Sequence, residues 1–203
     1  MKILVTGFES FGGETINPSW EAVRLLPERI GGGDTVKLLL PTEFLRAEKI
    51  LLAAIDEHAP DLVLCTGQAA GRKELSFERV AVNLRDASIP DNVGYKPSDE
   101  EVFPGGEAAY FATLPLKAMA QGVEKAGIPA GLSLSAGTYV CNDVMYTLLR
   151  RLDGTAARGG FVHLPLSTQQ AEGRRPELPS MSIEDMARGL EKAIEAAAQQ
   201  TSL

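Results

Sequence analysis

The chain has 203 residues, of which 44% are hydrophobic and 23% are charged, and its formal net charge at pH 7 is -7. These values are typical of an ordinary globular protein, so a single domain over residues 1–203 with a substantial core is expected. The acidic balance argues against a nucleic-acid partner, since nucleic-acid-binding proteins usually present a basic face.

No apolar run approaches the ~20 residues that a membrane-spanning helix needs, so no membrane partner is expected. The first apolar run, residues 2–7, is also too short for a signal peptide and is interpreted as a buried strand. Two cysteines are too few for a disulfide framework. These features predict a cytoplasmic protein whose thiols stay reduced.

Apolar strand-like runs alternate with helical patterns along the chain. The predicted strands lie at 2–7, 35–41, 61–67, 74–84, 130–137 and 159–166. The predicted helices lie at 17–26, 43–58, 115–127, about 142–152, and from Ser182 onward. Asn-Pro-Ser at 17–19 is a capping signal for the first of them, and Ser182 with Glu184 and Asp185 marks the start of the last. This order predicts an α/β fold with three layers, α/β/α, in which helices cover both faces of a twisted, mainly parallel sheet.

One long segment interrupts this alternation. Residues 85–106 carry three prolines and three glycines among many polar residues. Loops of this length inside a globular domain are usually functional or mobile, and either role is open for this one.

The two cysteines stand in different settings. Cys65 lies inside an apolar strand, where burial would raise the pKa of the thiol, and it is interpreted as a core residue. Cys141 comes just before a predicted helix, whose free N–H groups and dipole favour a thiolate and could hold an oxyanion. From its position alone, Cys141 is as consistent with a small buried side chain as with a nucleophile.

The two histidines also differ. His58 ends a helix, where it would serve the last carbonyl groups. His163 lies 22 residues after Cys141, at the end of an apolar strand. A right-handed crossover of that length would make their two strands parallel neighbours, with the thiol and the imidazole at one edge of the sheet.

A carboxylate should orient the imidazole of such a pair, and the spacing of acidic residues does not choose among several. Glu78 lies between apolar residues, but it could instead pair with an arginine. The arginines concerned are Arg72, Arg79 and Arg85. The candidate carboxylates are Glu9, Glu43, Glu74, Glu78, Asp86 and Asp91.

No metal site or cofactor is expected, because two histidines and two cysteines without clustered spacing form no zinc pattern. The segment GFESFGG at 7–13 lacks the Gly-Lys-Ser/Thr of a phosphate-binding loop. Its Phe8 and Phe11 suit the wall of a pocket for a flat, uncharged ligand, or they simply plug the strand ends.

Nine segments between residues 7 and 186 form a distinctive series. They are GFESFGGETINPSW, LPTEF, GQAAGR, ERVAVN, IPDNVGY, ATLPLKAM, SAGTYVCN, GFVHLP and PSMSIEDM. No single segment is decisive, but their joint order is highly specific. Together they resemble the pyroglutamyl-peptidase I (pyrrolidone-carboxylate peptidase) family of cysteine peptidases.

This resemblance implies a triad in which Cys141 is the nucleophile, His163 the general base and acid, and Glu78 the orienting carboxylate. It implies hydrolysis of N-terminally pyroglutamylated peptides through a thioester, and a homo-oligomer, either a tetramer or a dimer. It also implies a pocket for the pyrrolidone ring. By position, the pocket residues are Phe8, Phe11, Thr42, Gln68, Ile89, Tyr139 and Val140.

The chain departs from the family at one position. The family commonly has an arginine before Ile-Pro-Asp-Asn, whereas Ser88 stands there, and Arg85 is a candidate substitute.

Two other functions are alternatives for this sequence. A nucleoside phosphorylase-like transferase would need a phosphate site that these segments lack, and a pyroglutamate-binding protein would keep the pocket with weak or no turnover.

Overall fold

The computed structural model describes residues 1–172 and 175–200, and its centre is a seven-stranded sheet of order β2-β3-β1-β4-β9-β5-β8. Strands β3, β1, β4 and β9 are parallel, whereas β2 pairs antiparallel with β3 and β5 antiparallel with β9. The strands are β1 (Lys2–Phe8), β2 (Arg29–Ile30), β3 (Gly33–Leu40), β4 (Leu62–Gln68), β5 (Leu75–Glu78), β8 (Ala130–Ser133) and β9 (Arg158–Leu164). The predicted α/β fold with a mainly parallel sheet is confirmed.

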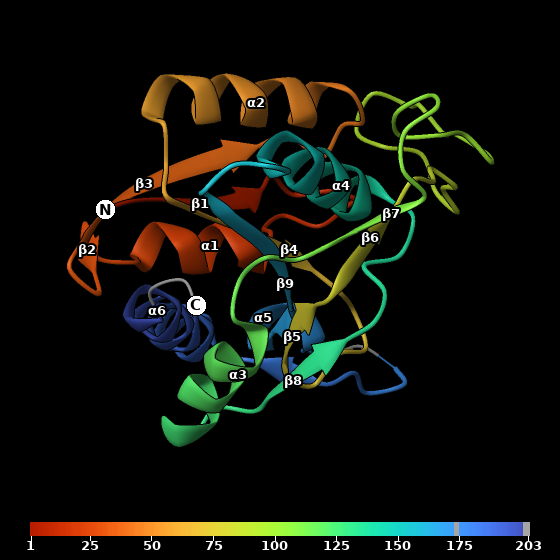
Figure 1. Ribbon diagram of the computed structural model, residues 1–203. Coiled ribbons are helices and arrows are strands. Elements are labelled where there is room, and N and C mark those ends of the chain that lie inside the picture. The colour runs from red at the N-terminus through yellow and green to blue at the C-terminus, as the bar shows by residue number, and fades with distance from the viewer. Residues whose placement is uncertain (173–174, 201–203) are drawn as a thin grey trace.

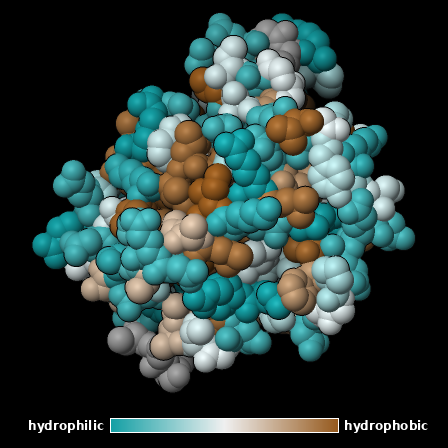
Figure 2. All heavy atoms as spheres, turned by 90° about the horizontal axis from the view of Figure 1, so that it is seen from above, coloured by the Kyte–Doolittle hydropathy of each residue, from teal (hydrophilic) through white to brown (hydrophobic). Residues whose placement is uncertain are grey.

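Helices cover both faces of this sheet (Figure 1). On one face lie α2 and α4, and on the other lie α1, α3 and α6. The helices are α1 (Pro18–Leu25), α2 (Arg46–His58), α3 (Leu116–Lys125), α4 (Val140–Leu152), α5 (Thr168–Ala171) and α6 (Ile183–Gln199). Among the described residues, none of the helices is long and apolar enough to cross a membrane. Figure 2 looks onto the α2–α4 side, where small groups of apolar side chains interrupt a mostly hydrophilic surface.

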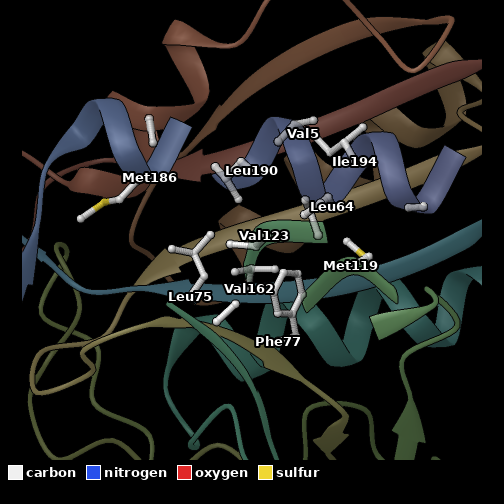
Figure 3. Close-up of a cluster of buried hydrophobic side chains, with 14 of the residues drawn as sticks. Val5, Leu64, Leu75, Phe77, Met119, Val123, Val162, Met186, Leu190 and Ile194 are labelled. Carbon is white, nitrogen blue, oxygen red and sulfur yellow. The ribbon is translucent and has the colours of Figure 1, made fainter. Parts of the chain in front are cut away.

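The central strands are apolar on both faces, as expected of strands that helices cover on each side. Val5, Leu64 and Val162 point toward α3 and α6, where they pack with Met119 and Leu190 (Figure 3). Their chain neighbours point the other way, toward α2 and α4; examples are Leu4, Cys65 and Phe161.

Two helix starts follow the predicted capping signals. The Asn17 side chain accepts a hydrogen bond from the Ser19 backbone N–H at 3.1 Å, and the Ser182 hydroxyl accepts one from the Asp185 N–H at 3.1 Å. Helix α2 begins three residues later than predicted, at Arg46, because Leu45 has a φ of 61°, which lies outside the helical region.

The predicted strand 74–84 is wrong as a single element. Its first part is β5 in the main sheet, and its second part is β6 (Val80–Val82), which pairs instead with β7 (Ala109–Phe111). The alternation of apolar residues continues through both parts, so it does not mark the point at which the chain changes partner. A further small sheet joins β10 (Leu166–Ser167) and β11 (Ser180–Met181).

The predicted crossover between parallel neighbours around α4 is also wrong. Strand β8, which precedes Cys141, lies at the edge of the sheet, and β5 lies between β8 and β9. Because β8 is parallel to β5 and β5 is antiparallel to β9, the two strands that flank α4 run in opposite directions. Strand β5, which comes before the long segment 85–106 in the chain, is inserted between β8 and β9. The sequence separation within residues 130–166 does not reveal this insertion.

The long segment 85–106 contains no helix or strand apart from an isolated bridge between Arg85 and Glu100. Hydrogen bonds nevertheless hold it. The Asp91 carboxylate accepts from the backbone N–H groups of Phe44, Val93 and Tyr95 at distances of 2.8–3.0 Å. This anchor fixes the middle of the segment against the start of the 43–58 region.

A buried ionic cluster joins the start of this segment to two helices. The Arg85 guanidinium lies 2.5 Å from Asp143 on α4 and 2.6 Å from Glu48 on α2. Thr147 donates to the second Glu48 oxygen at 3.0 Å. Burial raises the pKa of Asp143 to about 8, and the negative charge of Glu48 acts in the same direction, while Arg85 opposes both.

This raised pKa makes stability depend on pH. In the unfolded chain an aspartate titrates at ~4. Between that pH and about 8, Asp143 in the folded protein therefore holds a proton that it has lost in the unfolded chain. The contribution of Asp143 is therefore most favourable below pH ~4 and is lost progressively as the pH rises toward the folded value. We expect Asp143→Asn to flatten the fall in the free energy of unfolding between pH 5 and pH 8. Urea denaturation at a series of pH values in this range would measure it.

Asp56→Asn is the matched control, because Asp56 forms an ion pair with Arg151 at the surface. The Asp56 side chain is 64% exposed and that of Arg151 is 44% exposed. This control should leave the pH slope unchanged. A slope in Asp143→Asn equal to that of the unchanged protein would contradict the assignment.

Candidate active site

A carboxylate and an imidazole meet on the face of the sheet that α4 covers. His163 Nδ1 on β9 lies 2.8 Å from Glu78 Oε1 on β5. Glu78 is completely buried, and His163 is 5% exposed. Beside an ionised carboxylate, which only accepts hydrogen bonds, Nδ1 would carry the hydrogen of a neutral ring, and Nε2 would be the nitrogen free to accept a proton.

The Cys141 thiol reaches the same face from α4, whose second residue it is. Gly67 on β4 is the register partner of His163 on β9, and neighbouring parallel strands lie ~4.8 Å apart. A Cβ atom on Gly67 would lie only 2.8 Å from Cys141 Sγ. The sulfur therefore lies over Gly67, beside His163, in a space that exists because residue 67 has no side chain.

The start of α4 is held on its other side by Asn142. This buried side chain accepts from the Val82 N–H at 2.9 Å and donates to the carbonyl groups of Val82 and Leu84 at 2.9 and 3.0 Å. Since these bonds tie the residue after Cys141 to β6, they limit movement of the thiol relative to the sheet.

The surroundings of both thiols disfavour ionisation. Burial raises the pKa of Cys141 to about 12, and the negative charge of Glu78 adds to this, while a backbone hydrogen bond at the helix start opposes it. Burial likewise raises the pKa of Cys65 to about 12. The two differ in surroundings, because Cys65 is completely buried in the core and Cys141 is partly exposed beside His163. Cys141 can act as a nucleophile only if a base takes its proton during attack.

Partly exposed apolar side chains lie next to the start of α4. The rings of Phe11 and Tyr139 are 6.1 Å apart between centroids, and Phe44 packs edge-on against Tyr139 at 5.3 Å. The Tyr139 hydroxyl donates to the Pro90 carbonyl at 3.0 Å, and the preceding residue, Ile89, is 43% exposed. This surface could contact one face of a small flat ligand.

Three other predicted pocket residues present little side-chain surface. Phe8, Thr42 and Val140 are at most 3% exposed, and the Thr42 hydroxyl donates to the Glu9 carbonyl at 2.9 Å. Any contact of these three with a ligand would therefore involve backbone groups or a movement. Gln68 ends β4 and is partly exposed, and its side-chain oxygen accepts from Gln170 at 3.0 Å.

Most other sequence candidates are engaged elsewhere. Arg85 is held in the cluster with Asp143 and Glu48, so it does not substitute for the arginine that Ser88 replaces. Glu43 pairs with Arg46 at 3.0 Å. Gly67, Phe44 and Asn142 were not identified from the sequence; only Gly67 carried a signal, as a glycine at the end of an apolar strand. Within residues 1–172 and 175–200, no three His, Cys, Asp or Glu side chains form a group that could hold a metal ion.

Comparison with known proteins gives one family. The family model described as pyroglutamyl peptidase matches residues 1–200. The pyrrolidone-carboxylate peptidase of Thermococcus kodakarensis is 51% identical over 196 residues, which cover 96% of this chain and 94% of that protein. The protein of the same name from Erwinia tasmaniensis is 52% identical over 194 residues, covering 95% and 91%.

Solved structures agree. The crystal structure of Bacillus amyloliquefaciens pyroglutamyl peptidase I superposes with a TM-score of 0.94 at 42% identity, covering 98% of this chain and 97% of that one. A mutant pyrrolidone carboxyl peptidase from Pyrococcus furiosus gives 0.93 at 42% identity, covering 98% and 99%.

The space at Gly67 makes a specific prediction. In Gly67→Ala the added Cβ would lie 2.8 Å from both Cys141 Sγ and Phe161 Cζ, so the thiol must shift. We expect the free energy of unfolding to fall by about 1–3 kcal/mol, which is typical of overpacking. We also expect the rate of alkylation of Cys141, measured by mass spectrometry, to change.

Gly131→Ala is the matched control. The atoms nearest its added Cβ are those of the flexible carboxylate end of Glu74, which can rotate away. Equal effects of the two substitutions on Cys141 alkylation would contradict the placement of the thiol over Gly67.

Proposed function

Because the chain belongs to the pyroglutamyl peptidase family, we propose that it is a cysteine peptidase that removes N-terminal pyroglutamate from peptides. The observation that carries the proposal is the 2.8 Å contact of His163 with the buried Glu78, beside a Cys141 sulfur that lies over Gly67. This arrangement supplies a nucleophile, a base and a group that orients the base.

The first step is attack on the carbonyl that joins pyroglutamate to the next residue. His163 Nε2 takes the proton of Cys141 as the sulfur forms its bond to the carbonyl carbon, so a thiol with a raised pKa need not ionise beforehand. Glu78 accepts the Nδ1 hydrogen and stabilises the imidazolium that forms. Backbone N–H groups at the start of α4 hold the oxyanion.

The intermediate then collapses. The imidazolium of His163 gives its proton to the leaving amine, the C–N bond breaks, and a thioester to Cys141 remains. Water, deprotonated by His163, attacks the thioester carbonyl and releases pyroglutamate, and the thiol recovers its proton. The triad therefore ends each turnover in its starting protonation state.

The ring of pyroglutamate carries no charged amine, so its recognition requires an apolar surface and neutral hydrogen-bonding groups. Phe11, Ile89 and Tyr139 supply the exposed apolar surface. In this proposal, backbone groups near Gln68 pair with the lactam N–H and C=O. Phe8, Thr42 and Val140 form the buried support of this pocket.

We also propose a homo-oligomer on the basis of the resemblance.

Two matched substitutions test this function. Cys141→Ala removes the nucleophile and should lower kcat for a chromogenic pyroglutamyl amide by at least ~10³-fold, as loss of a nucleophile does in other peptidases. Cys65→Ala removes the core thiol and should leave kcat within about tenfold, because that thiol is buried away from solvent.

Turnover that survives in Cys141→Ala would exclude the mechanism. Binding of pyroglutamate by the unchanged protein without any turnover would instead support the alternative of a binding protein.

A further inference from the structure

A second cation-bearing residue lies against the triad. Arg72, in the loop between β4 and β5, places Nη2 3.4 Å from Glu78 Oε1. The same nitrogen donates to the Ser133 hydroxyl at 3.1 Å and to the Ser135 carbonyl at 3.5 Å. Its side chain is 38% exposed, whereas that of Glu78 is completely buried. Arg72 therefore connects the surface to the buried carboxylate and to the segment that leads into α4.

The hydrogen bonds of Glu78 show why this contact matters. Oε1 faces both His163 Nδ1 and Arg72, while Oε2 is buried and has no hydrogen-bond partner among the described residues. A buried carboxylate is unfavourable unless a positive charge pairs with it. When His163 is neutral, the positive charge in contact with Glu78 is the guanidinium of Arg72.

Among the described residues, two thiols also lie near His163. Cys141 approaches from α4 and Cys65 lies behind it on β4, and burial raises the pKa of both thiols. The Phe161 ring packs against the imidazole at 4.9 Å. The charged groups that contact one another beside His163 are thus the carboxylate of Glu78 and the guanidinium of Arg72.

We propose that Arg72 is a positioning residue whose guanidinium keeps Glu78 ionised while His163 is neutral. Without that guanidinium, the carboxylate and the imidazole would hold a proton between them to a higher pH. An imidazolium cannot accept the proton of Cys141, so the base would be lost over part of the neutral range. The consequence for turnover rests on the proposed function, whereas the charge arrangement can be measured without it.

The two histidines make that measurement direct, because the chain has only His58 and His163. We would follow the imidazole C–H signals by NMR as the pH is raised, with His58→Gln to assign them. In Arg72→Met and Arg72→Gln the midpoint of the His163 titration should rise by roughly half a pH unit or more. Arg72→Lys keeps the charge and should restore the midpoint.

Lys73→Met is the matched control, because it removes one positive charge from an exposed neighbour in the same loop. It should leave the His163 midpoint unchanged, and His58 should titrate alike in all variants. A His163 midpoint that stays unchanged or falls in both neutral Arg72 variants would overturn the proposal.

Kinetics provides a second readout. In Arg72→Met the acidic limb of kcat/KM should move to higher pH by the same interval, whereas a purely structural defect would lower the rate equally at all pH values. If the unchanged protein fails to hydrolyse pyroglutamyl amides, the proposed function fails, but the NMR titration still decides the role of Arg72.

Discussion

A completely buried carboxylate in contact with an imidazole is the constraint on which the site depends. Glu78 can bond His163 only because β5 lies beside β9 and runs antiparallel to it, with Glu78 opposite Phe161 and Ser76 opposite His163. Both side chains then point toward α4. The antiparallel insertion of β5 into an otherwise mainly parallel sheet is therefore what brings the acid to the base. A uniformly parallel sheet would place the ends of these strands differently.

The thiol is positioned by a second set of contacts around the start of α4. Gly67 leaves the space that the sulfur occupies, and Asn142 bonds the helix start to β6. On the opposite side, Asp143 joins the helix to Arg85 and thereby to α2. Fixing one helical turn from two directions restricts the sulfur to a small region beside His163, which is what proton transfer over hydrogen-bond distance requires.

Local sequence patterns predicted the fold class and the caps at Asn17 and Ser182, because both depend on neighbouring residues. The order of the strands could not be predicted, because the period-2 pattern of 74–84 is the same whichever strand it pairs with. The choice of Glu78 among six carboxylates came from the family resemblance and not from spacing. The predicted crossover placed Cys141 and His163 at one edge of the sheet on the premise that their strands are parallel neighbours, whereas β8 and β9 are antiparallel and not adjacent.

The position of positive charge then separates two ways of supporting a cysteine nucleophile. A cation beside the sulfur would lower the pKa of the thiol and favour a standing thiolate. Here Ser88 supplies no charge and Arg85 is held by Asp143 and Glu48, while Arg72 lies behind Glu78. In the proposal for Arg72, a cation in that place acts on the carboxylate and the imidazole and not on the thiol, whose pKa burial raises. The proposed mechanism therefore relies on a neutral base that removes the thiol proton during attack, and not on a thiolate that exists before the substrate arrives.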